Sequence, residues 1–290
     1  MALTMSDCTL LVPLAVVIIV LSQQKTKTFL LVDAAMELVV SVALIFASSP
    51  FTYESLSTLR YDSNHHVLSQ FNLCYGLLTP LFYLFCARSA KGEEATQALL
   101  ATRTFELGLM VFNQCRTPQI FNDKHNVLIL AIAMWFCLTA FHLYSNGVIL
   151  PKSSSNSFIN RCIKIDVSLE TTFGTLDLFG AAFVTMLVSA PTDLLHVHIL
   201  KVATAGHLTS ALMGVYARGF SNIADTKGYI CCRLTLLLML GGCFAYSVIN
   251  QRIILSPFDW CVYLAGFVQM VPLLAGLLRC GDEATPSKRD

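Results

Sequence analysis

The fold of this chain is limited first by a series of long, unbroken apolar runs. A helix crosses a bilayer with roughly 20 apolar residues, and only helices or closed barrels satisfy their own backbone groups in lipid. The runs do not alternate apolar and polar residues, so they predict helices. They cover residues 9–22, 29–49, 70–87, 98–113, 126–148, 172–190, 199–217, 229–248 and 258–278. The sequence therefore predicts an all-α fold, a multi-pass transmembrane helical bundle of about nine spans.

The composition agrees with a membrane protein. Hydrophobic residues make up 55% of the chain and charged residues only 13%, whereas a soluble domain carries about a quarter charged residues. The mean hydropathy is +0.65, and the formal net charge of +1 gives no reason to expect a nucleic-acid partner. The predicted partner is the lipid bilayer, and a homo-oligomer or a membrane-protein partner stays open.

The loops between the runs predict the orientation in the membrane, because cytoplasmic loops carry an excess of Lys and Arg. When the loops are assigned alternately to two faces, each loop on one face holds two or three of these residues, and each loop on the other holds at most two. This asymmetry predicts an exoplasmic N-terminus and a cytosolic C-terminus. The first run has the length of a signal-peptide core, but no positive charge precedes it, which favours a retained anchor.

Two of the runs share a sequence pattern. "GLLTPLFYLFCAR" at 76–88 and "GHLTSALMGVYAR" at 206–218 match at Gly, Leu, Thr, Ala and Arg with a spacing of 130, and Arg103 meets Arg233 at the same spacing. Each repeat has an even number of spans, so the repeats are parallel, and transporters with parallel repeats place ligands between them. The predicted parts are an N-terminal anchor with linker (1–28), two four-helix repeats (29–150 and 151–279) and a disordered cytosolic tail (280–290).

The register of the repeat is harder to assign upstream of this pair. "ASSP" at 47–50 resembles "VSAP" at 188–191 at a spacing of 141, which predicts an insertion of about eleven residues in the first repeat. In this register Asp177 lies at nearly the same depth as Asp33, and Glu37 has no acidic counterpart in exact register.

Ionisable residues inside spans are costly and are therefore candidate functional groups. Two interpretations stay open: ion pairs that fix the order of the helices, and a cytosol-facing polar vestibule that binds a charged solute or relays protons. The residues predicted to bind substrate are Glu37, Glu106, Asp177, His207, Thr79 and Thr209. The residues predicted to form structural ion pairs are Arg88, Arg103, Arg218 and Arg233.

Histidines form a second group, at the outer ends of the spans. His65 and His66 precede the third run, and His196 and His198 precede the seventh. Four imidazoles suit zinc, copper or nickel, or would sense external pH. Adjacent histidines chelate one ion poorly, however, and no carboxylate pattern completes a site. Solvated loop histidines and no metal are therefore predicted.

The sequence contains no motif of a known catalytic or nucleotide-binding site. It lacks a nucleotide-binding glycine loop, H-E-x-x-H, G-x-S-x-G and C-x-x-C. No catalytic residue and no cofactor are predicted, and a membrane-embedded enzyme ranks last of three hypotheses. The first hypothesis is a carrier or channel for a small solute, which predicts a cavity between the repeats with several candidate residues in it. The second is a non-catalytic membrane scaffold or partner protein, which predicts a dry interior with every acid paired to an arginine.

Overall fold

Helices dominate the part of the chain that the structure describes. The structure is a computed structural model, and it describes residues 5–46, 53–89, 93–152, 157–187, 193–250 and 257–283. Within these ranges there is no strand, and an isolated bridge joins Ser57 to Phe121. The all-α prediction is therefore confirmed. The elements are α1 (Met5–Ser22), α2 (Thr26–Phe46), α3 (Tyr53–Leu56), α4 (Ser63–Tyr75), α5 (Leu78–Phe82), the π-helix η1 (Tyr83–Ala87), α6 (Glu94–Gln114), the 3-10 helix η2 (Pro118–Ile120), α7 (Asp123–Ser145), α8 (Phe158–Leu187), α9 (Leu194–Ala217), α10 (Ile223–Ile249) and α11 (Pro257–Glu283).

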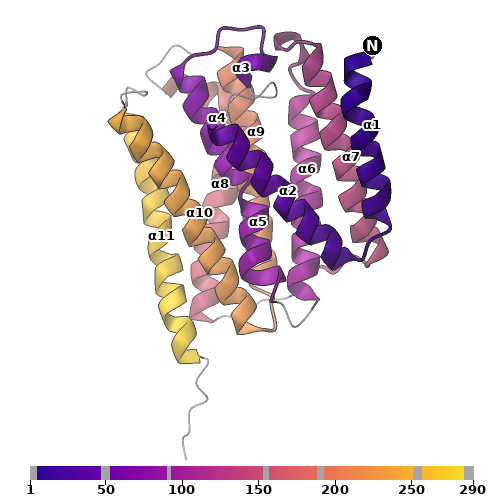
Figure 1. The fold of residues 1–290 in the computed structure, drawn as a ribbon. Coiled ribbons are helices and arrows are strands. Elements are labelled where there is room, and N and C mark those ends of the chain that lie inside the picture. The colour runs from indigo at the N-terminus through magenta and orange to yellow at the C-terminus, as the bar shows by residue number, and fades with distance from the viewer. Residues whose placement is uncertain are drawn as a thin grey trace, which may run out of the picture.

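The helices lie side by side in one bundle (Figure 1). Helix α6 packs against α9, and α10 packs against α4, α5 and η1. Helices α8 and α11 cover one side of this group, while α7 packs on α6 and α1 packs on α7. Helix α2 crosses in front of α4 and α5, which it contacts.

Contacts at the two ends of the bundle show how the helices run. The side chain of His65, near the start of α4, lies 3.0 Å from Asp193, the N-cap of α9. At the opposite end, Glu94 at the start of α6 accepts a hydrogen bond of 2.7 Å from the backbone of Ser221, just before α10. Helices α4 and α9 therefore run in one direction, and α6 and α10 run in the other.

The rod made by α4, α5 and η1 is interrupted where its sequence cannot keep regular helical hydrogen bonds. Helix α4 ends at Tyr75, and Pro80, which has no backbone N–H, lies in the following short helix. Beyond it the backbone N–H of Arg88 donates to the carbonyl of Tyr83, five residues back, at 2.8 Å. Such a π-turn takes up one extra residue and often marks a functional segment.

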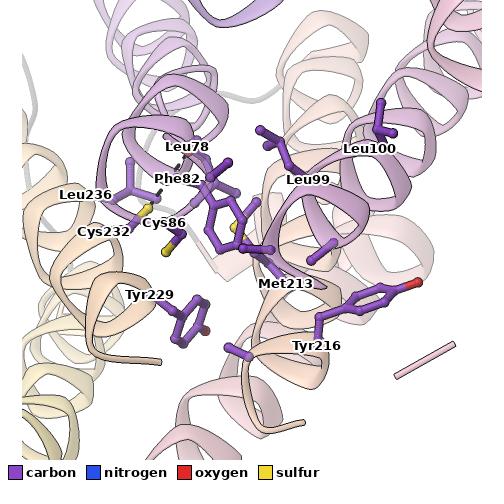
Figure 2. Packing of buried hydrophobic residues seen from close by; sticks show 14 of the residues in the cluster. Leu78, Phe82, Cys86, Leu99, Leu100, Met213, Tyr216, Tyr229, Cys232 and Leu236 are labelled. Atoms are coloured by element: carbon purple, nitrogen blue, oxygen red, sulfur yellow. Dashed lines mark hydrogen bonds between the residues drawn. The ribbon is translucent and has the colours of Figure 1, made fainter. Parts of the chain in front are cut away.

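The apolar core lies where α5, η1, α6, α9 and α10 meet. Figure 2 shows Phe82 between Leu78 and Leu99, with Met213 and Tyr229 below them. All five side chains are fully buried. The core therefore joins helices from both halves of the sequence, so the halves cannot separate without exposing it.

Three helical segments in the described residues are long and apolar enough to cross a membrane: 65–87, 123–145 and 223–249. Nine spans are not confirmed and stay a prediction. Helix α11 continues to Glu283, beyond the predicted start of the tail at residue 280, and the rest of that tail lies outside the described residues.

Candidate functional site

An arginine on α6 and two acids on α2 form the first buried polar group. Asp33 and Glu37 are four residues apart, so both side chains leave the same face of α2. Arg103 Nη1 lies 2.7 Å from Glu37 Oε1, and Arg103 Nε lies 3.3 Å from Asp33 Oδ2. The same Nη1 atom lies 2.8 Å from Oε2 of Glu106, which is one turn further along α6. Three carboxylates therefore share one buried guanidinium group.

Neighbouring helices donate hydrogen bonds to two of these carboxylates. Trp135 of α7 donates its indole N–H to Asp33 at 2.5 Å, and Thr79 of α5 donates to Glu106 at 3.4 Å. Asp33 Oδ2 and Glu37 Oε2 are both buried without a hydrogen-bond partner among the described residues. Asp33 Oδ2 still lies 3.3 Å from Arg103 Nε, whereas the ion pair of Glu37 uses its other oxygen, Oε1. A buried oxygen without a partner costs stability unless a ligand satisfies it. The first acidic group, made of Asp33, Glu37, Arg103 and Glu106, therefore has one carboxylate oxygen, Glu37 Oε2, with neither a hydrogen bond nor a contact to the arginine.

The second acidic group consists of Asp166 and Glu170 on α8 and Arg233 on α10. Arg233 contacts Asp166 through Nε and Nη2, at 3.1 Å each, and its Nη2 lies 2.5 Å from Glu170. Gln269 of α11 donates to both carboxylates, at 2.6 and 2.9 Å, and Tyr229 donates to Asp166 at 2.6 Å. This group is fully buried and, unlike the first, uses the oxygens of both carboxylates.

The two acidic groups share one sequence pattern. An Asp precedes a Glu by four residues in "VDAAMEL" (32–38) and again in "IDVSLET" (165–171). In each case the pair meets the arginine of the 130-residue repeat, Arg103 or Arg233. In each case, too, the aspartate accepts a hydrogen bond from the last helix of its repeat: Asp33 from Trp135 of α7, and Asp166 from Gln269 of α11.

The predicted counterpart of Asp33 is therefore wrong. Asp166 and Glu170, not Asp177, face the equivalent arginine, and Glu37 has Glu170 as its counterpart. The spacing of these acids is 133, so the proposed insertion of eleven residues is not needed. The repeated D-x-x-x-E was the signal that would have found them, but the "ASSP" match set the register instead.

His207 connects the second acidic group to the first half of the chain. Its Nδ1 atom lies 2.9 Å from Glu170 Oε2 and 3.0 Å from the hydroxyl of Tyr75, on α4. Its Nε2 atom lies 3.5 Å from Asp177 Oδ2. Asp177 thus faces a histidine rather than an arginine.

Two cavities open onto these groups. The larger has a volume of about 860 Å³ and is lined by the whole first acidic group together with apolar residues of α1, α2, α4, α6, α7 and α9. The smaller, of about 220 Å³, is lined by Glu170, Asp177 and His207. Tyr75 lines both cavities and so lies in the wall between them. It fits there because Gly206 has no side chain: a Cβ at that position would lie 2.5 Å from Cβ of Tyr75.

The predicted substrate-binding residues divide between the two cavities. Glu37 and Glu106 line the larger one, and Thr79 reaches it through its hydrogen bond to Glu106. Asp177 and His207 line the smaller one. Thr209 is buried and lines neither, and no partner of its hydroxyl group is found among the described residues.

Of the four arginines predicted to form ion pairs, two lie inside the acidic groups and two lie at helix ends. Arg103 and Arg233 are the centres of the acidic groups. Arg88 is exposed at the end of η1, and no ion pair in the described part of the chain includes it. Arg218 is half-buried at the C-cap of α9.

Five residues of the site were not predicted from the sequence: Asp166, Glu170, Tyr75, Trp135 and Gln269. The last three belong to no repeated pattern in the sequence.

The outer histidines do not form the predicted group of four solvated rings. His65, His196 and His198 are buried. His65 and His196 lie against each other with ring centroids 3.6 Å apart, whereas His66 lines the larger cavity and His198 lies 2.5 Å from Thr117. The reason is local: His65 and His196 each close a capping turn at a helix start, which draws both rings inward.

At this outer end the carboxyl group of Asp193 has a lowered pKa. Burial raises the pKa of the Asp193 carboxyl, but hydrogen bonds from the backbone of His196 and from the rings of His65 and His196 bring it down to about 2.

Comparison with known proteins assigns a family and nothing more. Residues 31–277 match a protein-family model described as "Domain of unknown function (DUF8292)". The matched range begins just before Asp33 and ends in α11, so it includes both acidic groups. No curated protein and no solved structure matches the chain.

Proposed function

We propose that this chain, which belongs to the DUF8292 family, is a multi-pass membrane protein that binds a small cationic solute and moves it across the bilayer. In this proposal nine segments span the membrane, with the N-terminus exoplasmic and the C-terminus cytosolic. They are the eight long helices of the described residues and the rod made by α4, α5 and η1. Residues 29–150 and 151–279 are two parallel four-helix repeats, and the solute site is the larger cavity between them.

The positions of charged and apolar side chains support the membrane assignment. Helices α6 and α8 carry charges at Arg103, Asp166 and Glu170, but these side chains are buried inside the bundle. Charged residues within spans face the bundle interior in this way. The outer surface, by contrast, exposes apolar residues, including Val39 of α2 (67% exposed) and Leu278 of α11 (78%). A surface of this kind suits contact with lipid tails.

The contacts between helices support the parallel repeat. Helices α4 and α9 run in the same direction, and each is the second long rod of its repeat. The packing of α6 on α9 has its counterpart in the packing of α10 on α4 and α5. A half-turn about the membrane normal would exchange these pairs and would also exchange the Arg103 and Arg233 groups.

The observation that carries the proposal is the buried Oε2 atom of Glu37, which has no partner and lines a cavity of about 860 Å³. This volume lies in the range of ligand pockets, about 300–1,000 Å³. Three carboxylates and one guanidinium leave the cavity with an excess of acidic groups, which favours a cation. The remaining lining is mostly apolar with some polar residues, and it includes the aromatic residue Trp135. Aromatic faces attract organic cations. Glu37 and Glu106 would bind the cationic head, and Arg103 would hold both in place.

A scaffold remains the alternative function, and the second acidic group favours it. There Arg233, Gln269 and Tyr229 satisfy both carboxylates, as a purely structural ion pair requires. The first acidic group departs from that pattern, which is why we rank transport first.

Uptake into proteoliposomes tests the proposed function. Vesicles containing the full chain are assayed with radiolabelled choline, tetraethylammonium and agmatine, and we expect saturable uptake of at least one. Glu37→Gln should reduce that uptake at least tenfold. Glu93→Gln changes an exposed glutamate at the N-cap of α6 and should leave uptake unchanged. Absence of uptake and of binding for every cation, with the fold intact, would favour the scaffold. Equal uptake by Glu37→Gln would remove the proposed site.

A further inference from the structure

Two copies of a D-x-x-H turn meet at the outer end of the bundle. Asp62 and His65 form the turn that begins α4, and Asp193 and His196 form the turn that begins α9. Each aspartate accepts a hydrogen bond of 3.0 Å from the backbone N–H of its histidine. Each aspartate N–H in turn donates to Nδ1 of that histidine, at 3.1 and 3.3 Å. The same capping turn is thus used twice, once in each half of the chain.

The two turns face each other and their side chains cross. His65 Nε2 lies 3.0 Å from Asp193 Oδ1, in the other half of the chain. His196 Nε2 points toward Asp62 Oδ1 but lies 3.8 Å away, too far for a hydrogen bond. The contact of His65 with Asp193 is therefore within hydrogen-bond distance, whereas the contact of His196 with Asp62 is not; we call the second one the open contact.

The open contact leaves a buried nitrogen without a partner. His196 is 3% exposed, and its Nε2 atom has no hydrogen-bond partner among the described residues. Its Nδ1 atom lies 2.9 Å from Asp193 Oδ1. An ion binds Nε2 once the ring proton has moved to Nδ1, which then donates it to that carboxylate instead of accepting from the Asp193 N–H. This arrangement of carboxylate, imidazole and lone pair is how metal-binding histidines are oriented.

The donor set and its spacing suit one divalent transition metal. Ligand atoms of Asp62, His65 and His196 all lie within 4.8 Å of one another. Zinc binds imidazole nitrogen and carboxylate oxygen at about 2.0–2.2 Å, so an ion fits between His196 Nε2 and Asp62 Oδ1 with little movement. The side chains of Asp62 and Asp193 are 44% and 39% exposed, which gives an ion access from solvent.

We propose that Asp62, His65, Asp193 and His196 bind one Zn²⁺-type ion that ties the starts of α4 and α9 together. Asp62, His65 and His196 are the direct ligands. The ion takes the place of the proton that His65 Nε2 now directs at Asp193, and Asp193 orients His196. Because the ligands come from both halves of the chain, the ion binds only when the halves are docked, and it stabilises that state by mass action. The proposal concerns the outer end of the bundle and does not depend on solute transport.

Calorimetric titration of the chelator-treated full chain in nanodiscs with ZnCl2 tests this site. We expect one ion per chain and a thermal midpoint that rises with Zn²⁺ concentration. Co²⁺ in its place should give the visible absorption of a four-coordinate site. Asp62→Asn changes an exposed side chain and should weaken Zn²⁺ binding at least tenfold, and His196→Gln should abolish it. His66→Gln, at the neighbouring imidazole outside the cluster, should bind as the unchanged chain does.

Three results would overturn the proposal. The first is no Zn²⁺ binding by the folded, unchanged chain. The second is equal binding by His196→Gln or by Asp62→Asn. The third is an ion retained by a variant that combines Asp62→Asn with His196→Gln, which would place the ion elsewhere, for example on cysteines. Should His196→Gln fail to fold, Asp62→Asn decides alone, with the circular dichroism spectrum as the check on its fold.

Discussion

The hydroxyl group of Tyr75 lies 3.0 Å from Nδ1 of His207, and this contact joins the two halves of the chain. Tyr75 ends α4, and His207 lies in the middle of α9. The Tyr75 ring also lines both cavities, and the same His207 nitrogen lies 2.9 Å from Glu170. A displacement of the Tyr75 ring would therefore change both the wall between the cavities and the hydrogen bonding of His207 next to the second acidic group.

Gly206→Ala should displace this ring. The new methyl group would lie 2.4 Å from Cγ and 2.5 Å from Cβ of Tyr75, and the Cβ atom cannot move without the helix backbone. We expect a loss of about 1–3 kcal/mol from overpacking. Gly242→Ala is the matched control, because nothing lies within 4 Å of its added carbon, and both variants gain the same chain-entropy benefit of about 0.4–1 kcal/mol. Thermal unfolding in detergent compares them, and equal midpoints would contradict the prediction.

Arg233→Met should be strongly destabilising. It leaves the carboxylates of Asp166 and Glu170 buried without their cation, and removing one partner of a buried pair costs about 3–5 kcal/mol. Arg88→Met removes an exposed arginine from the end of η1 and should change stability by less than about 0.5 kcal/mol. Thermal midpoints measure both.

Further substitutions around Arg233 test why Arg233→Met should be destabilising. If the loss comes from unpaired charge, adding Asp166→Asn and Glu170→Gln to Arg233→Met should recover part of the stability. A triple variant no more stable than Arg233→Met would mean that packing of the long arginine side chain, rather than charge, is what matters.

Glu37→Gln should mainly weaken solute binding, whereas Glu170→Gln should mainly lower the stability of the fold. Glu170 uses both oxygens, on Arg233, Gln269 and His207, so its amide variant should lose about 1–3 kcal/mol of stability. Glu37 keeps one oxygen without a partner, so its variant should change stability less and solute binding more. Thermal midpoints and cation binding to the detergent-solubilised protein give the two readouts. The reverse ranking in stability would contradict this prediction.

Acidification should weaken the contact of Glu94 with the loops that precede α8 and α10. Partial burial raises the pKa of Glu94, but hydrogen bonds from Lys152 and from the backbone and side chain of Ser221 outweigh it, so the pKa lies below its ordinary value. A folded-state pKa below the unfolded one, about 4.3, gives stability that is present above that pH and is lost as pH falls through the folded value. Since Lys152 is 59% exposed, we expect less than about 1 kcal/mol.

Glu94→Gln tests the sign of this effect. The difference in thermal midpoint between the variant and the unchanged chain should shrink as pH is lowered from 6 to 3. Glu93→Gln, at the exposed neighbour, should show no such pH dependence. A difference that grows on acidification would show that the contact does not lower the pKa of Glu94.

The sequence predicted the helices well because each follows from local chemistry. Apolar runs with few breaks become helices wherever they lie, and the helices of the structure overlap every predicted run. Arg103 and Arg233 were also found, since a match of residue types at a spacing of 130 needs no knowledge of contacts. The acids of the second group were missed because the register between the halves changes from 133 at Asp166 to 130 at Arg233, and a short chance match suggested another value.

By itself, then, the sequence determined that the chain is helical and which arginines recur. The tertiary structure decided which carboxylates those arginines meet, that Tyr75 separates two cavities, and that two aspartate–histidine turns cross at one point. The physical reason is that a helix forms from interactions within about four residues. The partner of a side chain depends instead on how helices that are more than a hundred residues apart are rotated and shifted along their axes. Only the packing of these helices against each other sets that arrangement.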